Sequence, residues 1–329
     1  MEYTTLGKSG LEVSRIGLGC MSFSTGGWRE WVLGEAESRE IIERAIDLGV
    51  TFFDTANMYA EGESERVLGR ALDGYDRNQL VVATKAHPSM GPEPYPIGEE
   101  GGGLSRKGID QALANSLDRL GMDTIDLYQI HRWDYHTPVE ETLQALSDAV
   151  RRGEARYLGA SSMWAYQFAE ALQASNHLGL ERFVSMQNHY NLAYREEERE
   201  MLPLCANEGI GVVPWSPIAR GYLARPHEAY ETTTRGETDS YAEYLDYTRG
   251  GGPAINERVE HIAEEKGATM AQIALAWLLH QDVVDAPIVG TTSVEHLEEA
   301  VEALDIDLSE SDLEYLEEPY EPVAVVGHD

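Results

Sequence analysis

The sequence predicts an α/β fold of the (β/α)8 type, a TIM barrel that residues 1–329 form as a single domain. Apolar runs suited to buried parallel strands alternate with amphipathic helical patterns along the whole chain. Eight such runs are present, and eight is the number of strands in that barrel. The predicted strands end near Gly19, Asp54, Lys85, His131, Ser162, Asn188, Trp215 and Thr291.

A doubly wound sheet would show the same alternation of strands and helices. Such sheets often carry the pattern GxGxxG between the first strand and helix, and this chain has no such pattern there. The segment Gly7-Lys8-Ser9-Gly10 instead predicts a hairpin turn ahead of the first barrel strand. We therefore expect an extra N-terminal β-hairpin that closes the bottom of a barrel.

Helix start and stop signals lie between the predicted strands. Ser105 can cap a helix whose apolar residues recur at helical spacing from Ile109 to Leu120. The segment from Thr137 to Glu140 reads as a capping box with proline in the first turn. Helices are expected to stop at Gly49, Gly121 and Gly153.

Two connections are much longer than the others. Both the segment from Met90 to Gly103, which is rich in Gly and Pro, and the segment from Gly221 to Pro253 follow predicted strands. In a parallel barrel those positions lie over the C-terminal face, where active sites are built. The sequence therefore predicts long loops over the catalytic face.

The charge balance excludes two classes of partner. The net charge is −33, with 58 acidic against 25 basic residues. Such a chain repels nucleic acid phosphates and anionic membrane surfaces, so we expect neither as a partner. Acidic residues recur along the entire chain beside only four lysines, which resembles proteins of halophilic organisms; the alternative is an ordinary acidic cytoplasmic protein.

Cysteine usage and hydropathy predict a cytoplasmic protein. Cys20 and Cys205 form no disulfide framework, and no cluster of Cys and His suggests a metal site. The N-terminus has no apolar signal region, and the apolar stretch from Ala271 to Leu279 is too short to span a bilayer.

Four polar residues at or just after predicted strand ends suggest proton-transfer chemistry. Lys85 ends an apolar strand, and a buried ammonium needs partners. Asp54 and His131 end similar strands, and Tyr59 follows Asp54 by five residues. If the strands are parallel neighbours, an acid, a phenol, an amine and an imidazole meet at one face. The alternatives are a plain buried Asp54–Lys85 ion pair and a core histidine.

This ordered set resembles the catalytic tetrad of aldo-keto reductases, and the likeness extends over nearly the whole chain. It is most similar to the bacterial YajO-like branch, which also resembles potassium-channel β subunits. The segments that carry the resemblance are YTTLGKSGLEVSRIGLGCMSF, FFDTANMYAEGESE, LYQIHRWDYHTPVEETL, GASSMWAYQFAEAL, SMQNHYNL and PWSPIARGYL.

The resemblance implies NADP(H)-dependent reduction of aldehydes or ketones, including sugar-like ones, to alcohols. Tyr59 would donate the proton, Lys85 would stabilise its phenolate, and Asp54 would hold Lys85 charged and oriented. His131 would polarise the carbonyl oxygen. A regulatory subunit like the channel β proteins would keep the same tetrad. A cofactor-free isomerase or aldolase is a third alternative.

The resemblance also implies positions for the cofactor. Ser161, Ser162 and Gln187 would bind the nicotinamide carboxamide, and Trp215 would stack on the ring. The segment from Ser216 to Gly221 would form a strap over the pyrophosphate. The expected contacts are Gly19, Met21, Asp54, Ser161, Ser162, Gln187, Trp215, Ser216, Pro217, Ile218, Ala219, Arg220, Gly221, Gly290, Thr291, Thr292, His296, Glu299 and Ala300.

The segment from Gly290 to Ala300 resembles the loop that binds the adenosine phosphate. A helix start suits a phosphate because of its free N–H groups, and Thr292 with Glu295 reads as its capping box. Gly290 and His296 stand where many relatives carry lysine and arginine. We expect NADPH to be preferred over NADH, by a narrower margin than in those relatives, and we expect no metal. The alternative is a capped surface helix without a ligand.

Aromatic residues lie in segments expected to rim a pocket for a small carbonyl or alcohol substrate. They suit apolar or sugar-like substrates, although loop tryptophans can simply pack against the barrel. The natural substrate, the direction and the oligomeric state stay open. The candidate pocket residues are Phe23, Trp28, Trp31, Trp133, Trp164 and Tyr222.

Overall fold

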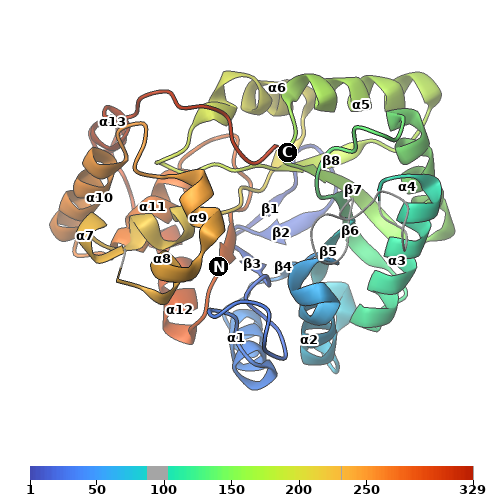
Figure 1. The fold of residues 1–329 in the computed structure, drawn as a ribbon, viewed down its shortest axis with the longest axis horizontal. Coiled ribbons are helices and arrows are strands. Elements are labelled where there is room, and N and C mark those ends of the chain that lie inside the picture. Colours follow the sequence, from blue (N-terminus) through green and yellow to red (C-terminus); the bar gives the residue numbers. More distant parts are fainter. Residues whose placement is uncertain (87–102, 231, 329) are drawn as a thin grey trace.

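The computed structural model describes residues 1–86, 103–230 and 232–328. Within them, eight parallel strands form one curled sheet, and most of the helices surround it (Figure 1). Each strand neighbours the next one in the chain, as a barrel requires and a doubly wound sheet does not. Around the sheet, the strands are β10 (Ile288–Gly290), β3 (Gly17–Gly19), β4 (Phe52–Asp54), β5 (Val81–Ala86), β6 (Ile125–Ile130), β7 (Ala155–Ser161), β8 (Phe183–Gln187) and β9 (Gly211–Val212).

Parallel bridges close the sheet between its first and last strands. Trp215, just beyond β9, pairs with Ile288 of β10, and the Ile288 amide donates to the carbonyl of Pro214 at 2.8 Å. The predicted (β/α)8 barrel is confirmed, and its strands end at or within one residue of most predicted ends.

The helices begin and end largely where the signals predicted. Gly108 N donates to the Ser105 side chain at 3.2 Å, and Gly121 and Gly153 adopt left-handed conformations just past their helices. Gly49 does so one residue after the C-cap Leu48. The helices are α1 (Glu35–Asp47), α2 (Glu63–Leu72), α3 (Arg106–Leu120), α4 (Val139–Arg152), α5 (Ala165–Leu178), α6 (Met201–Glu208), α7 (His227–Tyr230), α8 (Thr234–Thr238), α9 (Ser240–Leu245), α10 (Gly252–Lys266), α11 (Met270–Leu279), α12 (Val294–Glu302) and α13 (Glu310–Glu317).

The capping box predicted at Thr137 is wrong. Pro138 occupies the N-cap position of α4 and makes no side-chain cap. The Thr137 hydroxyl donates instead to Asp134 Oδ2 at 2.8 Å, and the same carboxylate accepts from the Leu104 amide. The Asp134 carboxylate thus binds the Thr137 hydroxyl, which the local pattern predicted as the cap of α4.

The predicted N-terminal hairpin is present and fills the bottom of the barrel. Strand β1 (Tyr3–Thr5) pairs antiparallel with β2 (Glu12–Ser14). Leu6, Leu11 and Val13 pack into one apolar cluster with inward residues of the barrel strands. That cluster also contains Phe52, Val81, Ala83, Leu127, Val213, Ala286 and Ile288.

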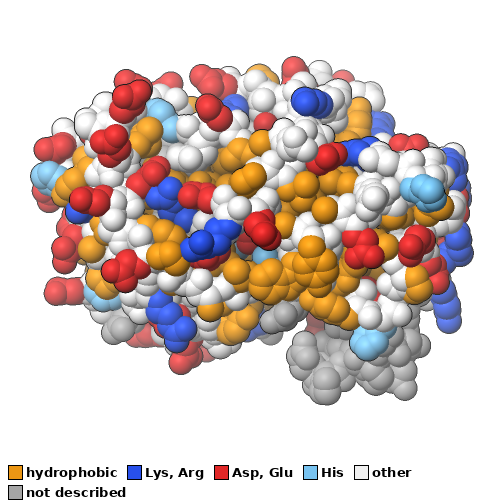
Figure 2. Space-filling model, turned by 90° about the horizontal axis from the view of Figure 1, so that it is seen from above, with side chains coloured by type: hydrophobic (Ala, Val, Ile, Leu, Met, Phe, Trp, Pro, Cys, Tyr) orange, Lys and Arg blue, Asp and Glu red, His pale blue; other side chains and the backbone are white. Residues whose placement is uncertain are grey.

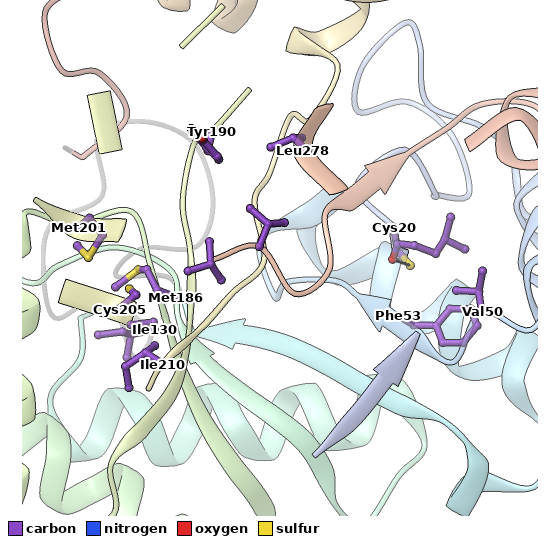
Figure 3. Close-up of a cluster of buried hydrophobic side chains, with 14 of the residues drawn as sticks. Cys20, Val50, Phe53, Ile130, Met186, Tyr190, Met201, Cys205, Ile210 and Leu278 are labelled. Atoms are coloured by element: carbon purple, nitrogen blue, oxygen red, sulfur yellow. Dashed lines mark hydrogen bonds between the residues drawn. The ribbon is translucent and has the colours of Figure 1, made fainter. Parts of the chain in front are cut away.

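A larger apolar core joins the outside of the barrel to its helices. Figure 3 shows two parts of it, one around Cys20, Val50 and Phe53 and another around Met186 and Cys205. Both cysteines are buried and free. Because the sheet is covered by this layer on one side and filled on the other, polar side chains inside the barrel need specific partners.

The long connection from Gly221 to Pro253 contains helices α7, α8 and α9. The other predicted long loop, from Met90 to Gly103, lies almost wholly outside the described residues. Figure 2 shows acidic side chains spread over one face, with hydrophobic ones gathered towards its middle. No helix in residues 1–86, 103–230 and 232–328 has both the length and the apolar character needed to cross a membrane.

Gly159 of β7 allows close packing inside the barrel. A Cβ atom there would lie 2.7 Å from Ser185 Oγ and 2.9 Å from Gln129 Cγ. We predict that Gly159→Ala lowers the free energy of unfolding by about 1–3 kcal/mol, the usual cost of overpacking a core. Gly10→Ala is the control, because its Cβ meets only Tyr157 Oη at 3.7 Å. Equal urea midpoints for the parent and Gly159→Ala would contradict the prediction.

Candidate active site

Three neighbouring strands bring the predicted tetrad together. β4 ends at Asp54, β5 carries Lys85, and His131 directly follows β6. Lys85 is 0% exposed, and its Nζ forms an ion pair with Asp54 Oδ1 and donates to the carbonyl of Thr55 at 2.9 Å. The Tyr59 hydroxyl lies 3.4 Å from the same Nζ. The ammonium therefore contacts both the acid and the phenol.

The Asp54 carboxylate is held by three donors. Besides Lys85, Gln129 Nε2 donates to Oδ2 at 2.9 Å and Gln187 Nε2 donates to Oδ2 at 2.8 Å. A buried carboxylate with this many donors is well compensated for its lost hydration. Gln129 and Thr55 were not among the predicted site residues. A glutamine next to the end of the mostly apolar run Ile125–Ile130 was the available signal for Gln129.

Tyr59 stands at the start of a short, strained turn. The 3-10 segment Tyr59–Gly62 follows β4, and Ala60 and Glu61 within it have φ values of 48° and 56°. Non-glycine residues rarely adopt this conformation, which clusters at functional sites. The Tyr59 ring packs edge-on against the His131 ring with centroids 5.7 Å apart. All four predicted catalytic residues thus share one site.

Burial and charge shift the ionisation of this group. Burial has the largest single effect on Lys85 and would lower its pKa, but the charges of Asp54 and Tyr59 and the hydrogen bonds to both together raise the pKa above the usual value. Burial raises the pKa of Tyr59, and the charge of Lys85 partly opposes that rise. At neutral pH the site therefore holds a charged ammonium beside a protonated phenol.

The residues expected at the nicotinamide carboxamide adjoin the tetrad. Trp215 Nε1 donates to Ser162 Oγ at 2.9 Å, and Ser162 Oγ lies 3.2 Å from Ser161 Oγ. Ser161 Oγ in turn donates to the carbonyl of Gln187 at 2.9 Å, and Gln187 binds Asp54. One chain of hydrogen bonds thus runs from the indole to the Asp54 carboxylate. Gly19 ends β3 in register with Asp54, and Met21 follows on the next loop.

The predicted strap has an unusual backbone. Ser216, Ala219 and Arg220 all have positive φ, as does Ser162 just after β7. In the remainder of the strap, Pro217 is buried, Ile218 is half-buried, and Gly221 has a φ of 98°. These conformations cost free energy unless the surroundings enforce them, and they are typical of ligand-binding turns.

Arg220 lies in a buried cluster with surplus positive charge. Its Nε donates to Asp239 Oδ2 at 2.7 Å, and Arg235 Nε reaches the same oxygen at 3.1 Å. One carboxylate therefore faces two guanidinium groups. Burial first, and then the charge of Arg220, lower the pKa of Arg235 to about 10. An anionic group such as a pyrophosphate would offset this charge, so the strap fits the predicted ligand.

The loop before α12 differs from the prediction in detail. Ser293, rather than Thr292, is the N-cap, and its side chain accepts from the His296 amide. The Thr291 hydroxyl donates to the Ser293 carbonyl at 2.9 Å, within the loop. Thr292 and His296 are exposed beside the helix start, as an ion-binding position requires.

Three further predicted contacts flank this loop. Glu299 is half-buried on α12, and Gly290 at the end of β10 is exposed. Ala300 is 2% exposed and packs in an apolar cluster with Ile16 and Leu275. Its Cβ thus belongs to the core between α11 and α12.

The predicted pocket aromatics occupy different environments. Trp28 and Trp31 pack edge to face at 6.3 Å, and the Arg235 guanidinium lies 4.2 Å above the Trp31 ring. Phe23 and Tyr222 are buried, whereas Trp133 is half-buried against the core. Tyr222 packs among Tyr230, His227 and Tyr247.

The C-terminal segment adds residues that no sequence pattern predicts here. From α13 it runs across the molecule towards β8 (Figure 1). His328 packs edge-on against Trp164 at 4.9 Å, and a Cβ on Gly327 would lie 3.3 Å from Trp215. His328 Nε2 also contacts Glu197 Oε1 at 2.8 Å. The segment therefore lies beside the predicted cofactor tryptophan.

Within the described ranges, no group of three or more His, Cys, Asp and Glu side chains could hold a metal ion.

Comparison with known proteins agrees with this geometry. The profile of the aldo/keto reductase family matches residues 15–321. Versiconal hemiacetal acetate reductase of Aspergillus parasiticus is 43% identical over 341 residues, covering 99% of this chain and 98% of that protein. A putative aryl-alcohol dehydrogenase of Schizosaccharomyces pombe is 43% identical, covering 99% and 97%.

A third relative, an aldo-keto reductase of Metarhizium robertsii, is 42% identical and covers 100% of this chain and 93% of its own. These three relatives are fungal, so they lend no support to the narrower likeness to the bacterial YajO-like branch. A halophilic origin likewise stays a prediction. The profile, the full-length relatives and the assembled tetrad show that the chain belongs to the aldo/keto reductase family.

Proposed function

We propose that this protein is an NADP(H)-dependent oxidoreductase that reduces aldehyde or ketone groups to alcohols and works reversibly. The observation that carries the proposal is the position of Lys85, buried between the Asp54 carboxylate and the Tyr59 hydroxyl. The hydrogen-bond chain through Gln187, Ser161 and Ser162 to Trp215 links that group to the expected cofactor side.

A reduced nicotinamide held by Ser161, Ser162, Gln187 and Trp215 would supply the hydride for the carbonyl carbon. The Tyr59 hydroxyl donates its proton to the oxygen that develops negative charge. Lys85 stabilises the resulting phenolate, and His131 donates a hydrogen bond to the same substrate oxygen. Asp54 keeps Lys85 charged and fixed. The same groups run in reverse during alcohol oxidation, with the phenolate as base.

The substrate class follows from the aromatic surroundings. Trp31 is half-buried under the Arg235 guanidinium, and Trp164 is exposed beside His328. The relatives' names include an aryl-alcohol dehydrogenase and a reductase of a hemiacetal acetate. We propose small carbonyl substrates with an apolar or aromatic body. Steady turnover of an aryl aldehyde with NADPH tests the activity; tight NADPH binding without turnover of any aldehyde would favour a regulatory subunit.

Tyr59→Phe removes the proton donor but keeps the ring that packs on His131. We predict that turnover falls by about 10²-fold or more, the usual contribution of general acid catalysis. Cofactor affinity should stay within a factor of about two. Tyr157→Phe is the control, because Tyr157 packs near the bottom cluster. Near-normal turnover by the folded Tyr59→Phe variant would show that Tyr59 is not the proton donor.

Lys85→Met tests the ammonium through the pH dependence of alcohol oxidation. Oxidation needs the phenolate, so its rate rises with pH as Tyr59 deprotonates. The charge of Lys85 opposes the burial that raises the Tyr59 pKa. Without that charge the pKa rises further, and we predict that the rising limb moves to higher pH with the largest loss near pH 7.

Removing Lys85 also leaves a buried carboxylate without its ion-pair partner, which can destabilise the fold. The double variant Lys85→Met with Asp54→Asn removes both charges and provides a second, neutral site. Both variants are compared with the parent from pH 6 to 11, after thermal unfolding has confirmed that they fold. A pH profile identical to the parent's in both would refute the mechanism.

The cofactor preference depends on the exposed start of α12. We predict that NADPH binds more tightly than NADH, because a 2′-phosphate would meet free N–H groups, Thr292 and His296. The preference should weaken in molar salt, which screens the charge of the phosphate. Dissociation constants for both cofactors in dilute buffer and in molar salt measure this; tighter NADH binding in both would overturn it.

A further inference from the structure

His189 lies at the centre of a stack of three flat rings. It follows β8 by two residues and is 1% exposed. Its imidazole is 4.1 Å from the Tyr194 ring at an angle of 13°, and 4.2 Å from the Trp215 indole at 10°. Tyr194 is buried, whereas Trp215 is half-buried. The stack of three rings is therefore buried at its Tyr194 end and partly exposed at its Trp215 end.

The barrel itself aligns His189 with Trp215. The two residues form a parallel bridge just beyond the ends of β8 and β9, and the Trp215 amide donates to the Asn188 carbonyl at 2.8 Å. Paired residues on adjacent strands project to the same side about 5 Å apart. Flat side chains at these positions can therefore stack. His189 covers one face of the indole, so a ligand ring can stack only on the opposite face.

The polar edge of the imidazole fixes how the ring is turned. Nε2 lies 2.9 Å from Tyr247 Oη and 3.3 Å from Asn191 Nδ2. Asn191 Nδ2 also donates to the Ser216 carbonyl at 2.9 Å. The imidazole is thus tied to the residue that follows Trp215 and to the segment after α9. Leucine or phenylalanine could fill the volume but could not make these hydrogen bonds.

The His189 imidazole beneath the indole is electrically neutral. Burial lowers the pKa of His189 well below its ordinary value, and the charge of Arg220 adds to the effect. The imidazole therefore stays uncharged at physiological pH. A cationic imidazole under the indole would draw the electrons of the indole away from a ring stacked on the opposite face.

We propose that His189 is a positioning residue for the nicotinamide end of the cofactor: its ring sets the plane of the Trp215 indole, and its Nε2 edge ties that plane to the strap. The inference rests on the proposed function, since Trp215 is the expected stacking partner of the nicotinamide. Ser162, which accepts from the indole N–H, fixes the same plane from another edge. A simple core residue would instead contribute only to stability.

The test compares a ligand that has the nicotinamide with one that lacks it. Calorimetry gives the dissociation constants of NADPH and of 2′-phospho-ADP-ribose, which is NADPH without its nicotinamide; NADH and ADP-ribose are measured in parallel. In His189→Gln the ring is lost and a polar end is kept. We expect its affinity for NADPH to fall about 3- to 10-fold, the scale of one aromatic stacking interaction. The fragment should bind as it does to the parent.

Comparing His189→Phe with His189→Gln separates the contribution of the flat ring from that of its hydrogen bonds. His189→Phe keeps a flat ring without the hydrogen bonds, and we expect a smaller loss of NADPH affinity than in His189→Gln. His280→Gln is the matched control, because that histidine caps α11 through Ala276 and lies in another part of the fold. It should bind both ligands normally. If His189→Gln does not fold, His189→Leu replaces it, since leucine is apolar but not flat.

Several results would overturn the inference. NADPH affinity in His189→Gln equal to the parent's would show that the ring does not position the indole. An equal loss for the fragment, or the same loss in His280→Gln, would show a general effect on the fold. If the parent binds neither NADPH nor NADH, the proposed function itself fails, and the inference fails with it.

Discussion

The buried ion pair between Lys85 and Asp54 is the interaction on which the site depends. An ammonium in the barrel interior has lost its water, so it remains charged only because a carboxylate, the Thr55 carbonyl and a phenol surround it. The carboxylate is satisfied in turn by Gln129 and Gln187. These contacts join β4, β5, β6 and β8 at their carboxyl ends, so the same charges that organise the chemistry also connect the strands across the barrel.

The cofactor side is organised by different forces. Three non-glycine residues of the strap and Ser162 have left-handed backbones, which the surrounding hydrogen bonds must enforce. The Arg220–Asp239–Arg235 cluster leaves one positive charge unbalanced in a chain whose net charge is −33. Stacked, neutral rings lie beside it. At the same mouth of the barrel, the arginine cluster thus provides positive charge for an anion. The stacked rings, at a separate position, provide a flat apolar surface for a ring.

Local patterns in the sequence failed where tertiary contacts competed for the same groups. Thr137 was expected to cap α4, but Asp134 binds its hydroxyl. Thr292 was expected to cap α12, but Ser293 does so, while Thr291 closes the turn before it. In each case several hydroxyls or acceptors lie within a few residues, and the backbone path, which depends on the barrel, selects one of them.

The sequence by itself determined the barrel, the bottom hairpin and the grouping of Asp54, Tyr59, Lys85 and His131, because parallel strands place residues at their carboxyl ends on one face. Only the tertiary structure decided the partners from distant segments. Gln129 on Asp54, His189 beneath Trp215, Asp239 on Arg220 and Gly327 against Trp215 join segments with no shared local pattern. Their contacts depend on strand register and loop path, which are set by the packing of the whole chain.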